Sequence, residues 1–210
     1  MKEYQIDIDD PDKEILRDVA RDMIEGKVVA FPTDTVYGLG TSIYNEIAIH
    51  KIFRIKGRPG SKALIALIDD NKRLEELVGS VPDIAHRLMD TFWPGALTII
   101  FPASDRLLPS ITKAGNIGIR MPDSTVVREL ARMAGRPLAT TSANRTGFKS
   151  ATAGYQVKAE IGREIDILLD GGRIDDGKES SIVDVAGDYP RILRVGAIKE
   201  EEIENILRKY

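Results

Sequence analysis

Two short segments of compact polar residues follow apolar runs in this sequence, and such segments are suited to hold a small ligand. Thr33-Asp34-Thr35 follow the run at 28–31, and Thr140-Thr141-Ser142-Ala143-Asn144 extend the run at 137–141. In open α/β sheets, ligands bind where strands end and loops begin. The hydroxyl and amide groups of these two segments can hold a phosphate or a sugar edge. An ordinary turn, or a helix cap by Asn144, explains the same residues without a ligand.

A basic segment, residues 50–62, lies between these two. It holds five bases and no acid: Lys51, Arg54, Lys56, Arg58 and Lys62. In an extended segment, Lys56 and Arg58 project to the same side. A lysine ammonium beside a planar arginine guanidinium is suited to bind neighbouring phosphate oxygens. One interpretation of this segment is therefore a binding site for a polyanion such as a nucleotide triphosphate or RNA. A solvated helix face followed by a basic loop is the other.

Two arginines stand in otherwise apolar runs, Arg120 in IGIRMP and Arg194 in RILRVG. A buried guanidinium needs a carboxylate or phosphate partner, because burying it alone is costly. Each arginine therefore predicts either a ligand contact or an internal ion pair.

The composition excludes several kinds of chemistry. The chain has 210 residues, no cysteine, two histidines and a net charge of −3. Disulfides, thiolate zinc sites and thiol nucleophiles are impossible, which suits a cytoplasmic protein, and a histidine metal centre is not expected. No run is long enough to span a bilayer. The sequence contains neither a G-x-x-x-x-G-K-[ST] loop nor a G-x-G-x-x-G segment after a strand.

Apolar runs alternate with amphipathic stretches along the chain. Predicted strands occupy 28–31, 62–68, 96–101, 117–121, 137–141, 166–170, 181–185 and 191–195. Predicted helices occupy the opening segment and stretches near 49–53, 72–78, 82–92, 124–134, 153–160 and 199–208. This alternation predicts a single α/β domain over 1–210, with a mixed sheet covered on both faces. Asp9 or Asp10 is expected to cap the first helix, with Pro11 in its first turn and Gly26 at its end.

Seven blocks occur in an order and at spacings that resemble the YrdC-like family of threonylcarbamoyl-AMP synthases, in its short single-domain form. They are FPTDTVYGLG at 31–40, KGRP at 56–59, FWPGALT at 92–98, IGIRMP at 117–122, TSANRTG at 141–147, ESSIVD at 179–184 and ILRVGAI at 192–198. The resemblance implies a twisted α/β domain with a large concave, basic cavity. It also implies an enzyme that makes threonylcarbamoyl-AMP from ATP, L-threonine and bicarbonate for the modification of tRNA.

The resemblance also implies roles for individual residues. The family's catalytic K-x-R and S-x-N sets fall on Lys56, Arg58, Ser142 and Asn144. ATP contacts fall on Arg58, Lys62, Asn116, Ser142, Ser150 and Arg194. Threonine contacts fall on Thr33, Thr35, Arg120, Thr140 and Ser180. Because Lys56 and Arg58 belong to a Gly- and Pro-containing loop, their replacement by alanine is expected to leave stability nearly unchanged.

Four positions depart from the family's pattern. Lys62 stands where many longer members have Asn, and Leu67 where several have His. Val195 replaces a Pro and Ser181 replaces a Thr. No charged phosphate contact is lost, and the change at Leu67 bears on the geometry of the amino-acid pocket.

The implied reaction joins two anions, so the site must neutralise the triphosphate. Lys56, Arg58, Arg194 and a Mg²⁺ ion arriving with ATP are expected to do this, without a protein nucleophile or a metal held by the protein. The expected partners are tRNA and the machinery that transfers the threonylcarbamoyl group, and no membrane is expected.

Three other functions are compatible with parts of the sequence. A non-enzymatic module that binds double-stranded RNA or tRNA, or assists ribosome maturation, would use the same basic cavity on phosphates. A carbamoyl-adenylate enzyme of hydrogenase maturation contains a related domain, but it carries zinc-finger cysteines that this chain lacks. A divergent relative without the activity would not need intact K-x-R and S-x-N sets.

Overall fold

The computed structural model describes residues 1–57, 64–175 and 177–208. Within these residues, ten strands form one sheet in the order β1-β8-β2-β3-β7-β4-β6-β5-β9-β10. In that order the strands are Lys2–Gln5, Ile167–Asp170, Val29–Phe31, Gly38–Ser42, Leu138–Ser142, Ile65–Leu67, Asn116–Arg120, Leu97–Pro102, Ser181–Asp184 and Arg191–Arg194. Parallel and antiparallel pairs alternate irregularly across the sheet, which confirms the predicted mixed α/β class.

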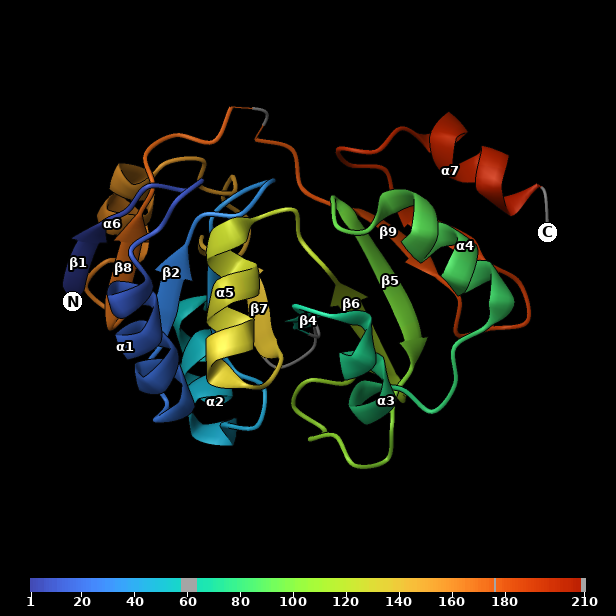
Figure 1. The fold of residues 1–210 in the computed structure, drawn as a ribbon, viewed down its shortest axis with the longest axis horizontal. Helices are drawn as coiled ribbons and strands as arrows, with labels where there is room; N and C mark the ends of the chain where they lie inside the picture. The colour runs from blue at the N-terminus through green and yellow to red at the C-terminus, as the bar shows by residue number, and fades with distance from the viewer. Residues whose placement is uncertain (58–63, 176, 209–210) are drawn as a thin grey trace.

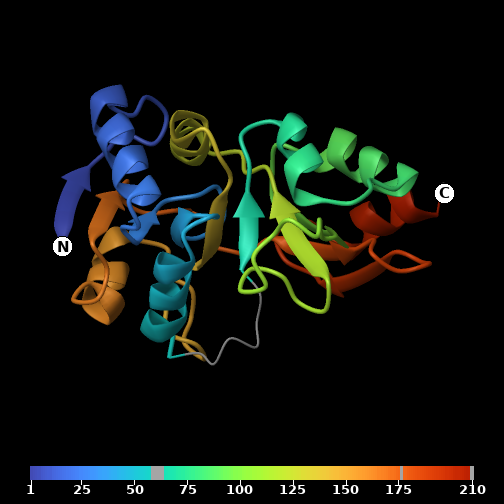
Figure 2. The same cartoon turned by 90° about the horizontal axis from the view of Figure 1, so that it is seen from below.

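Seven α-helices are present in the described residues: α1 (Lys13–Ile24), α2 (Glu46–Ile55), α3 (Leu74–Leu77), α4 (Asp83–Phe92), α5 (Thr125–Ala134), α6 (Gly154–Ile161) and α7 (Glu200–Leu207). A 3₁₀ turn, η1 (Asn71–Arg73), precedes α3. Helices lie on both sides of the twisted sheet (Figure 1, Figure 2). No helix in this part of the chain has the length and apolar character needed to cross a membrane.

Two buried clusters fill the space between the sheet and its helices. The smaller one joins α1 and α5 to inward side chains such as Phe31, Leu67 and Leu138. The larger one packs α2, α3, α4, α6 and α7 against the opposite face of the sheet. Alternate residues of a strand point to opposite faces. Ile65 and Thr140 therefore share the face of α1 and α5, and this face extends beyond those two helices towards β5 and β9.

Helix α1 begins later than the sequence predicted, because another aspartate caps it. Asp12 accepts hydrogen bonds from the backbone N–H groups of Glu14 at 2.8 Å and Ile15 at 3.3 Å. Asp7 instead holds the amides of Asp9 and Asp10 in a turn, at 2.9 and 3.2 Å. These backbone bonds also lower the pKa of Asp7. Neither Asp9 nor Asp10 is thus the helix cap.

Two strands were not predicted. Edge strand β1 is short and mostly exposed, so its sequence carries little alternation. Strand β3 is wholly buried although it reads as a glycine-containing loop. Its glycines allow close packing: a Cβ at Gly38 would lie 2.7 Å from Phe31, and one at Gly40 would lie 2.8 Å from Thr140. The close approach of neighbouring side chains therefore explains why glycine stands in this central strand.

Candidate active site

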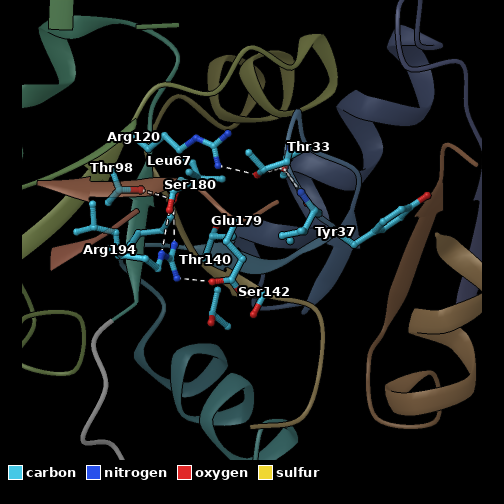
Figure 3. A pocket seen from close by; sticks show the side chains of 16 residues that line it. Thr33, Tyr37, Leu67, Thr98, Arg120, Thr140, Ser142, Glu179, Ser180 and Arg194 are labelled. Atoms are coloured by element: carbon cyan, nitrogen blue, oxygen red, sulfur yellow. Dashed lines mark hydrogen bonds and ion pairs between the residues drawn. The ribbon is translucent and has the colours of Figure 1, made fainter. Parts of the chain in front are cut away.

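A cavity of about 290 Å³ opens on the sheet face beyond α1 and α5. Its lining comes from seven strands and from the loops before β3 and β9. The lining includes Thr33, Thr35, Leu67, Thr98, Arg120, Thr140, Ser142, Glu179, Ser180 and Arg194. The charged members among these are two arginines and one glutamate. Figure 3 shows Arg120 and Thr33 at one end of the cavity, and Arg194 with Glu179 at the other.

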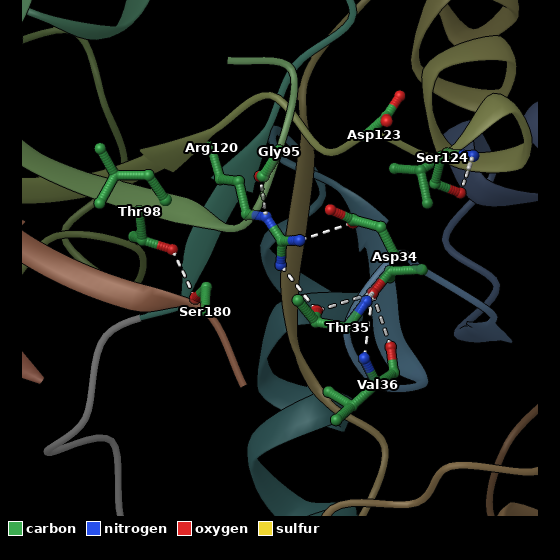
Figure 4. A network of polar contacts seen from close by, with 12 residues as sticks. Asp34, Thr35, Val36, Gly95, Thr98, Arg120, Asp123, Ser124 and Ser180 are labelled. Atoms are coloured by element: carbon green, nitrogen blue, oxygen red, sulfur yellow. Dashed lines mark hydrogen bonds and ion pairs between the residues drawn. The ribbon is translucent and has the colours of Figure 1, made fainter. Parts of the chain in front are cut away.

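Arg120, the last residue of β6, is held by contacts on three sides (Figure 4). Its Nε donates to the carbonyl oxygen of Gly95 at 2.8 Å, and Nη1 donates to Thr35 Oγ1 at 2.9 Å. Its Nη2 forms an ion pair with Asp34 at 2.5 Å. Arg120 is 4% exposed, and this burial lowers its pKa while Asp34 opposes the shift. The internal ion pair foreseen as an alternative is therefore present.

The ion pair leaves part of the guanidinium available. An arginine has five N–H groups in a planar fork, and three of them serve the contacts above. Arg120 belongs to the cavity lining, whereas its ion-pair partner Asp34 does not. Arg120 is thus a fixed donor at the cavity wall, an arrangement suited to a carboxylate ligand.

The segment before β3 forms a turn closed by a threonine side chain. Thr33 Oγ1 donates to the carbonyl oxygen of Val36 at 2.7 Å and accepts from the amide of Thr35 at 3.1 Å. The hydroxyls of Thr33 and Thr35 lie 3.0 Å apart. Both residues line the cavity, so the turn also brings two hydroxyls to its wall.

A second polar group surrounds the start of β9. Arg194 Nε donates to the carbonyl oxygen of Ser180 at 2.9 Å, and its Nη1 pairs with Glu179. Ser150 Oγ donates to the other oxygen of Glu179 at 2.6 Å. The hydroxyls of Ser180 and Thr98 lie 2.8 Å apart. Ser150, Ser180 and Arg194 are therefore linked, with Glu179 between the first and the last.

Lys56 lies beneath the turn that follows β7. Its Nζ donates to the carbonyl oxygens of Ser142 and Asn144, both at 2.7 Å, and to Asn144 Oδ1 at 3.1 Å. The Asn144 amide donates in turn to the carbonyl oxygen of Phe148 at 2.7 Å. Lys56 is 4% exposed. The premise of the alanine prediction, that Lys56 is a loop residue with few contacts, is therefore wrong, because this ammonium is buried and donates to backbone and side-chain oxygens of Ser142 and Asn144.

The other predicted site residues do not all line the same cavity. Thr140 and Ser142 line the central cavity, whereas Ser150 lines a neighbouring one of about 620 Å³. Asn116 begins β6 and lies outside the lining of both cavities. Arg58 and Lys62 lie outside the described residues. The structure thus brings the threonine set, Ser142 and Arg194 into one cavity, and the binding roles stay predictions.

Tyr37 belongs to the cavity lining, but its hydroxyl points away from the cavity (Figure 3). The hydroxyl donates to the carbonyl oxygen of Gly172 at 2.8 Å and to Asp170 at 3.2 Å. Burial raises the pKa of Tyr37, and the charge of Asp170 raises it further. Tyr37 therefore supports the fold as a protonated donor rather than acting as a base.

Three residues of the site were not predicted from the sequence. Thr98 and Glu179 line the cavity, and Gly95 anchors Arg120 through its carbonyl oxygen. Glu179 is the first residue of the ESSIVD block, but the resemblance assigns a role to Ser180 in that block and none to Glu179. Only the pairing of β9 with β10, which faces Glu179 towards Arg194, reveals its place.

Two curated proteins that are similar to this chain carry the same name. The chain is 44% identical over 186 residues to threonylcarbamoyl-AMP synthase of Bacillus subtilis, covering 87% of this chain and 54% of that protein. It is 35% identical to the Vibrio vulnificus protein of the same name, over 74% of this chain and 86% of the relative. The chain spans about half the length of the first curated relatives it matches.

A solved structure extends the likeness to three dimensions. The crystal structure of Pyrococcus abyssi Sua5 complexed with L-threonine superposes with a TM-score of 0.95 at 35% identity, over 99% of this chain and 61% of that one. The Sua5, YciO and YrdC family model, described as "Telomere recombination", matches residues 22–196. The family model, the curated relatives and the solved structure agree. The chain therefore belongs to the Sua5/YciO/YrdC family.

Proposed function

We propose that this protein forms threonylcarbamoyl-AMP and pyrophosphate from ATP, L-threonine and bicarbonate. The observation that carries the proposal is the meeting of two donor groups in one cavity, Arg120 with its hydroxyl neighbours at one end and Arg194 at the other. The relatives named threonylcarbamoyl-AMP synthase support the choice of reaction, and the threonine complex of Sua5 supports the amino acid.

In this proposal, the threonine carboxylate binds the two remaining N–H groups of Arg120. A planar guanidinium binds a carboxylate by two parallel hydrogen bonds. The hydroxyls of Thr33, Thr35, Thr140 and Ser180 surround the same space and would hold the amino and hydroxyl groups. Leu67 at this wall is apolar, so it contributes packing rather than a hydrogen bond.

The triphosphate is assigned to the other end of the cavity. Arg194 and Ser142 line it there, and Ser150 is linked to Arg194 through Glu179. Lys56 adds a buried positive charge and shapes the turn at Ser142 and Asn144. The family motif adds Arg58 and Lys62 to the phosphate contacts, and Asn116 to the nucleotide contacts.

The chemistry then proceeds in two steps. The amine of threonine combines with bicarbonate, forming a C–N bond and releasing water, to give an N-carboxylate. An oxygen of this carboxylate attacks the α-phosphate, and the bond from the α-phosphate to the bridging oxygen breaks so that pyrophosphate leaves. Both reactants are anions, so fixed positive charges and donors supply the catalysis by positioning and neutralisation.

Mg²⁺ is proposed to enter with ATP. The described residues contain no group of three or more His, Cys, Asp or Glu side chains placed to hold a metal ion. The acidic side chain in the cavity lining is Glu179, which is already paired with Arg194. This donor set fits an ion held mainly by phosphate oxygens, whose charge the ion would neutralise.

The product is a mixed anhydride of a carbamate and AMP, so an acyl transfer must consume it. We propose that a separate threonylcarbamoyl transferase passes the group to an adenosine of tRNA, with tRNA as the final acceptor. The finished modification is therefore expected only when that machinery is present.

Pyrophosphate release tests the proposal. We expect release from ATP to require both L-threonine and bicarbonate, because the attacking carboxylate exists only when the two combine. The assay uses three reactions, complete, without threonine and without bicarbonate in degassed buffer. Equal release in all three would indicate a plain pyrophosphohydrolase. No release, together with salt-sensitive RNA binding, would favour the non-enzymatic RNA module.

A further inference from the structure

Glu179 stands between two cavities of the molecule. It lines the central cavity together with Arg194 and Ser180, and it also lines the neighbouring cavity together with Lys149 and Ser150. The side chain is 39% exposed, as is that of Arg194. Its backbone is fixed, because its carbonyl oxygen accepts from the amide of Ala197 at 2.9 Å. The carboxylate therefore sits on an anchored backbone with open space on both sides.

The two carboxylate oxygens of Glu179 hold two of the donors assigned above to ATP. One oxygen accepts from Ser150 Oγ at 2.6 Å, and the other accepts from Arg194 Nη1. A hydrogen that is donated to a carboxylate is not available to a phosphate. The charge of Glu179 also opposes that of an incoming triphosphate at close range.

We propose that Glu179 is a positioning residue that competes with the phosphates of ATP for Ser150 and Arg194. The inference rests on the proposed function, since it takes these two residues as phosphate donors. The carboxylate and a phosphate oxygen are chemically similar acceptors for a guanidinium and a hydroxyl. ATP binding then requires the carboxylate to turn away from the central cavity. The neighbouring cavity provides room for it, with Lys149 in its lining.

The same competition assists departure of the leaving group. Once pyrophosphate is formed, Glu179 returns to Arg194 and Ser150 and takes over the hydrogen bonds that these residues donate to pyrophosphate. No charged donor is then left unpaired when pyrophosphate leaves. Glu179 thus weakens the binding of ATP and of pyrophosphate, and it has no direct contact with threonine in this scheme.

A purely structural role for Glu179 predicts the opposite change in ATP affinity when the carboxylate is removed. If the carboxylate only orients Arg194, its removal leaves the guanidinium misplaced and ATP binds more weakly. Arg194 has two further anchors, the carbonyl oxygen and the hydroxyl of Ser180, at 2.9 and 3.2 Å. These anchors should keep the guanidinium in place in the variant.

The test is calorimetric titration of the full chain with ATP and Mg²⁺, with threonine and bicarbonate left out. Glu179→Gln is expected to lower the Kd of ATP by about three- to tenfold, the modest effect of a partly exposed ion pair. Glu129→Gln is the matched control, because Glu129 pairs with Arg132 on α5, away from both cavities. The Kd of ATP for Glu129→Gln should equal the Kd for the parent protein.

Steady-state kinetics supplies the second readout. The KM for ATP and the inhibition constant of pyrophosphate should both fall in Glu179→Gln, while the KM for threonine stays unchanged. Glu179→Asp keeps the charge but is too short to reach both donors, so its Kd should lie between those of Glu179→Gln and the parent.

Two results overturn the inference and remain distinguishable. Equal or weaker ATP binding by Glu179→Gln, with normal binding by the parent, refutes the competition alone. Absence of ATP binding by the parent refutes the proposed function and the competition with it.

Discussion

Replacing Lys56 by alanine is expected to lower the free energy of unfolding by about 2–4 kcal/mol, the cost of removing a buried charged donor and leaving its acceptors unsatisfied. The ammonium lies within 2.7 Å of the carbonyl oxygens of Ser142 and Asn144. Since Ser142 lines the end of the cavity proposed for the phosphates, product formation should also fall by about a hundredfold, the usual effect of losing one fixed donor in an active site.

Urea unfolding and product assays at a temperature where the variant is folded check this prediction. Lys158→Ala is the matched control, because Lys158 pairs with Glu3 at 2.6 Å and its side chain is 57% exposed. Its stability should change by no more than about 0.5 kcal/mol. A Lys56→Ala protein that unfolds with the parent and makes normal amounts of product would show that the turn does not depend on this lysine.

Replacing Arg120 by lysine is expected to raise the KM for threonine by about ten- to a hundredfold, the loss of a charged hydrogen bond in a two-pronged contact. Lysine keeps the charge but cannot reach Gly95, Thr35 and Asp34 at once. The KM for ATP should remain close to that of the parent, because Arg194 and Ser142 stand at the other end of the cavity.

The comparison of the two KM values separates binding from stability. Loss of fixed contacts around a buried ion pair will also lower the melting temperature, so assays are done well below it. Arg191→Lys is the control, since Arg191 pairs with Asp184 but is 67% exposed. It should alter neither KM. A rise in the KM for ATP with an unchanged threonine response would assign Arg120 to the nucleotide instead.

Much of the fold could be predicted from apolar periodicity, and the exceptions have physical reasons. Each of the eight predicted strands coincides with an observed strand, although β4 takes up only Ile65–Leu67 of the predicted 62–68, whose first two residues lie outside the described residues. The helices near 82–92 and 124–134 are confirmed, because long periodic segments carry strong signals. Strand β3 was missed because Gly38 and Gly40 favour loops, and only the close approach of Phe31 and Thr140 explains them. Such an approach is a tertiary property that local spacing does not contain.

Most residues of the site could be predicted from the sequence, but the ion pairs that they form could not. The resemblance named Arg120, Arg194 and Ser180, and the structure places them in one cavity. It did not predict that Asp34 and Glu179 would pair with the two arginines. Residue spacing predicts which side chains follow a strand, whereas pairings between distant segments depend on the order of strands in the sheet.

The identity of the adenylate tests the central claim most directly. Purified protein is incubated with ATP, Mg²⁺, L-threonine and ¹³C-bicarbonate, and the quenched mixture is analysed by mass spectrometry. We predict an adenylate that contains both threonine and the labelled carbon, formed in step with pyrophosphate. An unlabelled threonyl adenylate, or nucleotide products that contain neither threonine nor the label, would contradict the proposed reaction.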